Sequence, residues 1–361
     1  AITASRELEI TLTGKNCGME ERAPMCGVPY HSVEGYLNRL VSKGYKVAIC
    51  EQVEDPKQTK GIVKREVVRV VTPGTNLNTQ ALDEGKNNYI MCIVYIGDKY
   101  GISTADVTTG DYFVTEIETS EKLFDEVYKF MPSEIVCNEA FYMSGVDLEE
   151  LKERLGITIY SLEAWYFDDL LCVNTLKDHF KVSSLEGLGL KDYECGIIGA
   201  GALLKYLLET QKTSLDHLTK LTGYTTGKYM ILDSSTRRNL ELCETLREKQ
   251  KRGSLLWILD KTKTAMGART LRKYIEQPLI EKQAITERLD AVEEFVGNAI
   301  CREEIREYLT PVYDLERLVS KIVYKSANPR DLTAFQSSLS MLPHIKCILQ
   351  DLKAPLLMKL C

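Results

Sequence analysis

The sequence predicts a multi-domain protein in which two α/β units are followed by an all-α segment. Its length of 361 residues corresponds to two or three domains at about 150 residues each. Strand-like and helix-like patterns alternate up to about residue 230, and only helical spacing follows. The composition, 44% hydrophobic and 27% charged, is typical of an ordered globular protein. We find no apolar run near the length of a membrane span and no signal peptide, so we expect a protein without a membrane partner.

The first predicted domain covers residues 1–74 and is a small mixed α/β unit. A helical opening leads through a turn-rich segment, residues 14–29, to a helix over residues 30–44 that ends at Gly44. Two buried strands are expected, at 45–53 and 66–74. The linker between them carries basic side chains that either contact phosphates or form a solvated charged loop: Lys57, Lys60, Lys64, Arg65 and Arg69.

The second predicted domain covers residues 75–230. Three strand-like runs, at 89–96, 100–107 and 110–117, predict an antiparallel meander. Helical and strand patterns then alternate, with helices expected at 122–131, 148–156, 167–180 and 195–211 and strands at 134–137 and 157–161. A meander followed by αβ units predicts a ribonuclease-H-like sheet covered by helices.

Local charge and isolated motifs in this second domain leave two questions open. Residues 111–154 hold twelve acidic and four basic side chains, which indicates either a solvated acidic surface or a docking face for a protein. Asp106 and Asp111 invite comparison with two-metal nucleases, but the sequence shows no matched carboxylates or nearby histidine, so we expect no nuclease and no metal site. Residues 223–229 fall one residue short of a phosphate loop and predict a turn before a strand at 228–233.

The third predicted domain covers residues 231–361 and is helical. Its apolar residues recur at helical spacing in runs at 254–262, 265–277, 285–296, 302–309, 315–324 and 330–342. Prolines are expected to separate the helices, at Pro278, Pro311, Pro329 and Pro343. Residues 234–273 carry eleven basic and four acidic side chains, so this stretch predicts a DNA-facing element or an interdomain lever.

The eleven cysteines indicate a reducing compartment. Their number is odd, they are spread along the chain, and none forms a CxxC pair. We therefore expect free thiols and a cytoplasmic protein.

The sequence resembles bacterial MutS DNA mismatch-repair proteins along nearly its whole length. Residues 4–16, 23–56 and 67–75 are similar to the mismatch-binding domain, and ISTADVTTGDY, residues 102–112, resembles the connector-domain hairpin. Three further motifs resemble the opening of the core, or lever, domain: LDSSTRRNLEL, SLLWILDKTKTAMGARTLRKYIEQPL and SANPRDLTAF.

The resemblance implies a role in DNA repair that is divided between this chain and segments outside it. It implies binding of mismatched double-stranded DNA, a homodimer, and recruitment of MutL through the connector and core in a bacterial, nucleoid-associated cytoplasmic protein. The family's Phe-x-Glu probe is expected shortly before Ala1, and its clamp and its ATPase, which uses ATP and magnesium, are expected after Cys361. We therefore expect this chain to hold no cofactor and to lack enzymatic activity alone. The alternative is a stand-alone docking module without a DNA role.

The resemblance also assigns candidate site residues. A turn beside the minor groove is expected to contain Met25, Gly27, Pro29, Tyr30 and His31, unless this turn packs its proline and tyrosine into the core. Phosphate contacts are expected from Lys60, Lys64, Arg65 and Arg69. Arg237 and Arg238 are expected to brace the junction with the core domain, the alternative being contact with DNA, and Asn239 and Arg269 are assigned to the same junction. Met266, Gly267 and Arg269 are expected to serve helix packing and internal pairing.

Overall fold

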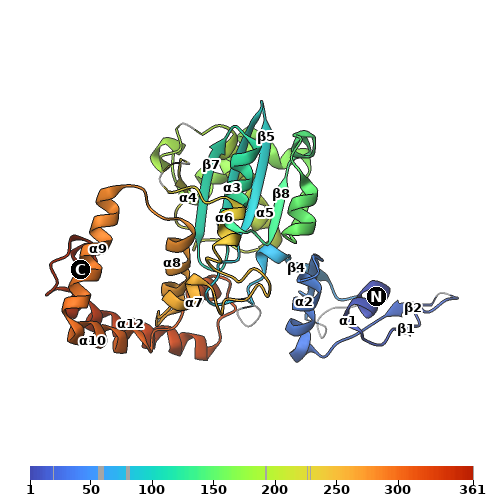
Figure 1. Cartoon of the computed structure of the whole chain (residues 1–361). Coiled ribbons are helices and arrows are strands. Elements are labelled where there is room, and N and C mark those ends of the chain that lie inside the picture. The colour runs from blue at the N-terminus through green and yellow to red at the C-terminus, as the bar shows by residue number, and fades with distance from the viewer. Residues whose placement is uncertain are drawn as a thin grey trace.

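The computed structural model describes residues 1–18, 20–55, 61–78, 82–191, 193–225, 227 and 229–360. Figure 1 shows three neighbouring parts: a small N-terminal part, a central sheet flanked by helices, and a set of C-terminal helices on the opposite side of the sheet from the N-terminal part. The fold is therefore mixed α/β followed by helices, as the sequence predicts. None of the described helices combines the length and apolar character that crossing a membrane would require.

The N-terminal part consists of two helices and two small hairpins. Its elements are α1 (Ile2–Leu8), β1 (Thr13–Lys15), β2 (Ala23–Met25), α2 (Val33–Val41), β3 (Val47–Gln52) and β4 (Arg65–Val71). Strand β1 pairs antiparallel with β2, and β3 with β4. Gly44 has a positive φ of 83° and follows α2, which confirms the predicted stop.

Two expectations about this part are wrong. The turn-rich segment at 14–29 contains the second strand of the unpredicted β1–β2 hairpin. Strands β3 and β4 are mainly exposed rather than buried. Among the described residues, the apolar cluster at these strands is small: Leu37 and Val41 of α2 pack with Val71, so most of the two-stranded sheet remains exposed.

The central part is built on a six-stranded sheet in the order β10-β7-β6-β5-β8-β9. Its strands are β5 (Ile90–Ile96), β6 (Lys99–Asp106), β7 (Asp111–Ile117), β8 (Glu134–Cys137), β9 (Thr158–Ser161) and β10 (Thr222–Gly223). Strands β5, β6 and β7 form the predicted antiparallel meander. Strands β8 and β9 run parallel to β5, which the intervening helical connections permit.

Helices cover both faces of this sheet, and alternate residues of β5 supply two cores. Met91 and Ile93 pack toward α3 (Ser120–Phe130). Cys92 and Val94 pack toward α4 (Asp169–Phe180) and α5 (Cys195–Gln211). At Gly101 the sheet and α5 touch so closely that an added Cβ would lie 2.2 Å from the Cys195 carbonyl oxygen.

The C-terminal part is helical. Its helices are α6 (Ser234–Asn239), α7 (Leu255–Leu259), α8 (Ala265–Glu276), α9 (Lys282–Gly297), α10 (Ala299–Leu309), α11 (Leu315–Val323), α12 (Pro329–Leu349) and α13 (Pro355–Met358). Pro278 and Pro311 lie between helices and Pro329 begins one, whereas Pro343 lies inside α12, so the expected break there is wrong. Only one backbone hydrogen bond is removed by an internal proline, and α12 continues past it.

Short helical turns complete the fold. The 3₁₀ turns are Tyr30–Ser32, Pro73–Thr75, Glu139–Met143, Ala164–Phe167 and Leu185–Leu188, and one π turn spans Glu150–Arg154. The π turn stands where a longer helix over 148–156 was predicted. The strand predicted at 228–233 is also wrong, because the described residues there form only an isolated bridge between Tyr229 and Leu279.

Candidate functional site

The end of β2 and the exposed loop that follows it contain the five turn residues that the family resemblance places beside the minor groove. Met25 ends β2, where its carbonyl accepts a 2.9 Å hydrogen bond from Thr13 Oγ1. Pro29 precedes the 3₁₀ turn, and its carbonyl accepts 3.0 Å bonds from the backbone and side chain of Ser32. Tyr30 is 85% exposed and Met25 is 44% exposed, and Gly27 and His31 are exposed as well. The alternative that Tyr30 packs the core is therefore wrong.

Among the described residues, the predicted phosphate contacts differ in exposure and in pairing. Lys60 lies outside the described residues. Lys64 and Arg65 are exposed, and the Lys64 ammonium pairs with Glu66 at 2.5 Å. Arg69 is half-buried, and burial lowers its pKa while Glu34 and Tyr324 oppose that change. Of the described members of this set, Arg69 is therefore the least exposed.

A buried carboxylate joins the N-terminal part to the sheet. Glu134 is fully buried and accepts hydrogen bonds from Gly74 N at 3.0 Å, from the Tyr206 hydroxyl at 2.8 Å and from Thr72 Oγ1. Burial, followed by the charge of Glu134, raises the pKa of Tyr206. Sequence reasoning missed this joint, although a glutamate opening the apolar run EIVC is a usable signal.

Arg237 holds three segments together at the next junction. It donates to the carbonyls of Leu232 at 2.9 Å, Tyr128 at 3.0 Å and Glu276 at 3.0 Å. Those carbonyls belong to the segment before α6, to α3 and to α8, so the arginine bridges the sheet's helical cover and the C-terminal helices. Arg238 and Asn239 are exposed and stand away from these bonds.

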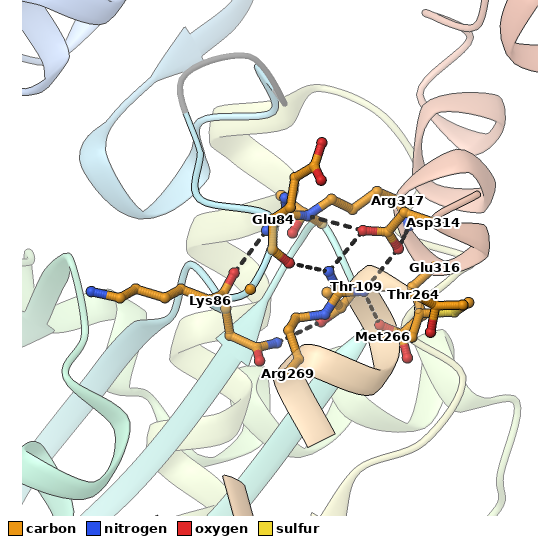
Figure 2. Close-up of polar contacts among 12 residues, drawn as sticks. Glu84, Lys86, Thr109, Thr264, Met266, Arg269, Asp314, Glu316 and Arg317 are labelled. Atoms are coloured by element: carbon orange, nitrogen blue, oxygen red, sulfur yellow. Dashed lines mark hydrogen bonds and ion pairs between the residues drawn. The ribbon is translucent and has the colours of Figure 1, made fainter. Parts of the chain in front are cut away.

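Arg269 forms the centre of a second junction, shown in Figure 2. Its guanidinium binds both carboxylate oxygens of Asp314, at 2.7 and 2.8 Å, and Glu316 Oε2 at 2.6 Å. It also donates to the carbonyl of Glu84 at 3.0 Å. Burial lowers the pKa of Arg269, but the two carboxylates raise it by more. Gly267, two residues earlier, donates its amide to Thr264, which caps α8.

Arg317 completes this junction and was missed by sequence reasoning. It is 3% exposed and donates to the carbonyls of Asp83 at 3.1 Å and Lys86 at 2.8 Å, as Figure 2 shows. Its Nε lies 3.7 Å from Asp314 Oδ2. The available signal was an arginine between Leu315 and Leu318 on the apolar face of a predicted helix.

Asp106 and Asp111 do meet, contrary to the expectation that no matched carboxylates could be assembled. They are register partners in β6 and β7, and the Asn87 amide donates to both, at 2.9 and 3.3 Å. Asp106 also accepts from Thr108 and from Asn88 N. Burial raises the pKa of Asp111, with Lys273 opposing and Asp106 adding to the rise. The pair thus anchors a turn, and within the described residues no three potential metal ligands gather.

Three family models match the chain in order. MutS domain I matches residues 1–80, MutS domain II residues 88–219 and MutS domain III residues 235–360. This succession defines a modular protein of the mismatch-repair class, in which the exposed loop lies in domain I and both arginine junctions involve domain III.

Curated relatives agree with this order. DNA mismatch repair protein MutS of Lachnoclostridium phytofermentans is 66% identical over 357 residues, which cover 99% of this chain and 38% of the relative. The proteins of the same name from Ruminiclostridium cellulolyticum and Acetivibrio thermocellus are each 52% identical, over 97% and 99% of this chain and 40% and 41% of theirs. The chain belongs to the MutS family, and it spans about 40% of the length of these relatives.

Proposed function

We propose that this chain is part of a MutS-type protein that recognises mismatched base pairs in DNA and relays recognition to an ATPase domain and to MutL. The observation that carries the proposal is the match to MutS domains I, II and III in order, with an exposed aromatic loop in the first. In this proposal the ATP and magnesium site lies outside residues 1–361, the complete protein is a cytoplasmic homodimer, and this chain alone performs no catalysis.

The physics of mismatch detection fits an exposed loop better than a base-reading helix. Any sequence can flank a mismatch, so the protein has to test how easily the duplex bends rather than read base edges. Apolar side chains that enter the minor groove unstack a step at a cost of a few kcal/mol, which is smaller where pairing is already faulty. Met25 and Tyr30 offer apolar surface for such a contact, and Gly27 lets the backbone approach closely.

The proposal includes a division of labour among three domains at 1–74, 75–230 and 231–361. The middle domain is proposed to be ribonuclease-H-like, because an antiparallel meander continued by two parallel strands is the arrangement of that fold. Its proposed docking face for MutL is acidic and carries exposed apolar side chains, including Met143 at 84% and Trp165 at 42% exposure. These same side chains favour the second candidate function, a docking module without a DNA role.

Fluorescence anisotropy with the 361-residue chain tests the DNA role. We expect weak binding to a matched duplex and to one with a central G·T mispair, at equal affinity, with the affinity falling steeply as salt is added. Equal affinity is expected because residues 1–80, which match MutS domain I, contain no Phe-x-Glu sequence. Tighter binding to the G·T duplex would show that discrimination resides in this chain without that probe.

A matched pair of tyrosines localises the contact. Tyr30→Ala should weaken binding to both duplexes, whereas Tyr313→Ala, which alters a tyrosine 58% exposed in the helical part, should not. Absence of binding to either duplex, or equal effects of the two substitutions, would overturn the DNA role and leave the docking module.

A further inference from the structure

The segment that leads into the central sheet is bound through three of its backbone carbonyls by arginines of the C-terminal helices. We call residues 82–88, which precede β5, the strap. Arg269 donates to the carbonyl of Glu84, and Arg317 donates to the carbonyls of Asp83 and Lys86. Figure 2 shows both guanidinium groups directed at this segment from the C-terminal helices. The arginines therefore bind the backbone of the strap.

The two arginines are themselves held in fixed positions. Their side chains are 5% and 3% exposed. Asp314 accepts hydrogen bonds from Arg269 through both carboxylate oxygens, and its Oδ2 lies 3.7 Å from Arg317 Nε. Charge-assisted, bidentate bonds shielded from water are geometrically specific, and an arginine fork retains this geometry where a lysine does not. Helices α8 and α11 thus meet the strap as one unit.

The strap also bonds to the sheet. Asn87 donates its side-chain amide to Asp106 and Asp111, and Asn88 N donates to Asp106. The Asn88 side chain donates to the carbonyl of Pro73 at 3.0 Å. Pro73 begins the turn after β4, so one short segment contacts the helical part, the sheet and the end of the N-terminal part.

Residues just before the strap extend this connection to α2. The Asn76 side chain donates to Asn38 Oδ1 at 3.0 Å, and the Asn78 side chain lies 3.4 Å from Glu34 Oε2. Asn38 and Glu34 belong to α2, the helix that follows the exposed loop. A continuous path of bonds therefore runs from α8 and α11, through the strap, to the N-terminal part.

We propose that Arg269 and Arg317 are positioning residues that set the orientation of the N-terminal part relative to the C-terminal helices by clamping the strap. A shift of α8 or α11 moves the clamped carbonyls and, with them, the part that carries the exposed loop. The inference rests on the proposed function in one respect, namely that this loop contacts DNA. Since the arginines hold carbonyls, substitution of the exposed Glu84 side chain should be silent, whereas Lys86, Asn87 and Asn88 make side-chain bonds of their own.

A distance measurement between the outer parts tests the clamp without DNA. Cys50 in β3 and Cys347 in α12 are exposed and accept spin labels once Cys17, Cys26, Cys243 and Cys361 are replaced by serine. Pulsed electron–electron double resonance between labels on Cys50 and Cys347 should give one narrow distance distribution for the chain that carries only these serine replacements. Arg269→Lys with Arg317→Lys should abolish the narrow peak, because lysine keeps the charge but loses the fork.

Two controls separate clamping from general loosening. Arg272→Lys alters a buried arginine of α8 that pairs with Glu276 on the same helix, and Glu84→Ala keeps the clamped carbonyl while removing an exposed side chain. Both should retain the narrow peak. Hydrogen exchange of β5–β7 should stay slow in the double variant while exchange in the strap accelerates.

An unchanged distribution in the double lysine variant overturns the inference, as does equal broadening by Arg272→Lys. If the double variant loses hydrogen-exchange protection throughout the sheet, the single variants Arg269→Lys and Arg317→Lys replace it. The widths of their distance distributions are then compared with that of Arg272→Lys. Failure of the anisotropy titration leaves this test intact, because the distance is measured on the chain alone. A broadened distribution with no change in DNA affinity would uphold the clamp and remove its proposed effect on DNA binding.

Discussion

The buried carboxylate of Glu134 provides a quantitative test of how the N-terminal part is attached to the sheet. Glu134→Ala removes the acceptor of the Gly74 amide and of the Tyr206 hydroxyl. Each buried group left without a partner costs about 1–3 kcal/mol, so the free energy of unfolding should fall by about 2–6 kcal/mol. Glu134→Gln keeps one carbonyl oxygen, and the tyrosine hydroxyl can accept from the new amide, so its loss should be about 1 kcal/mol.

Urea unfolding monitored by tryptophan fluorescence measures these losses. The chain has two tryptophans, and a Trp257→Phe background leaves Trp165, beside α4, as the reporter of the central part. Glu139→Ala serves as the matched control because Glu139 is exposed and lies near the end of the same strand. A loss for Glu134→Ala below about 1 kcal/mol, or equal to that of the control, would refute the reasoning that these bonds are buried and unreplaced.

Three further predictions concern other parts of the fold. Arg237→Ala should lower the free energy of unfolding by about 3 kcal/mol or more, since three carbonyls lose their donor. Arg238→Ala is the control and should leave urea unfolding unchanged, so equal effects of the two substitutions would contradict the bridging role of Arg237. Gly101→Ala should destabilise the protein by about 1–3 kcal/mol, because the added Cβ would lie 2.2 Å from a backbone atom of Cys195. Gly35→Ala should stabilise it by up to about 1 kcal/mol, because Gly35 lies in α2 with open space around its Cβ position. Thermal melts compare the two variants, and a higher melting temperature for Gly101→Ala than for Gly35→Ala would contradict this packing. Burial lowers the pKa of His217 below its ordinary 6.5, so the unfolded chain takes up the proton first and the free energy of unfolding should fall as pH drops through about 6.5. His217→Gln should reduce the slope of the free energy of unfolding against pH, measured by urea titrations between about pH 7 and 5. An unchanged slope would assign the pH dependence to other groups.

The sequence predicts those elements whose burial repeats along the chain. The runs at 89–96, 100–107 and 110–117 lie close to β5, β6 and β7 because sheet residues alternate between two covered faces. The same apolar signal misled for β3 and β4. Val67 and Val68 are 43% and 37% exposed, since a β-branched run indicates a strand without indicating what covers it.

Site residues were predictable only where a motif marks them. Arg269 was expected to form an internal pair because a charged residue in a packed helix needs a partner, but its partners Asp314 and Glu316 follow after more than forty residues. Glu134 meets Thr72 across 62 residues of sequence. Periodicity reports the face on which a residue lies and carries no information about which distant residue it meets, so the joint and Arg317 were missed.

The way in which the parts are joined bears on how they can move. The apolar clusters lie mainly within one part each: one holds Leu37, Val41 and Val71, two flank the sheet, and one joins α9, α10, α12 and α13. Among the described cluster members, Tyr324 is the residue from the C-terminal part that packs against a cluster of the sheet. The junctions instead rest on directional bonds from Glu134, Arg237, Arg269 and Arg317. Hydrogen bonds to charged groups contribute about 1.5–3 kcal/mol each. A ligand that binds one orientation of the parts more tightly than another favours that orientation, when its difference in binding free energy exceeds the cost of exchanging two or three such bonds. Parts with separate cores can therefore change orientation without disturbing their interiors.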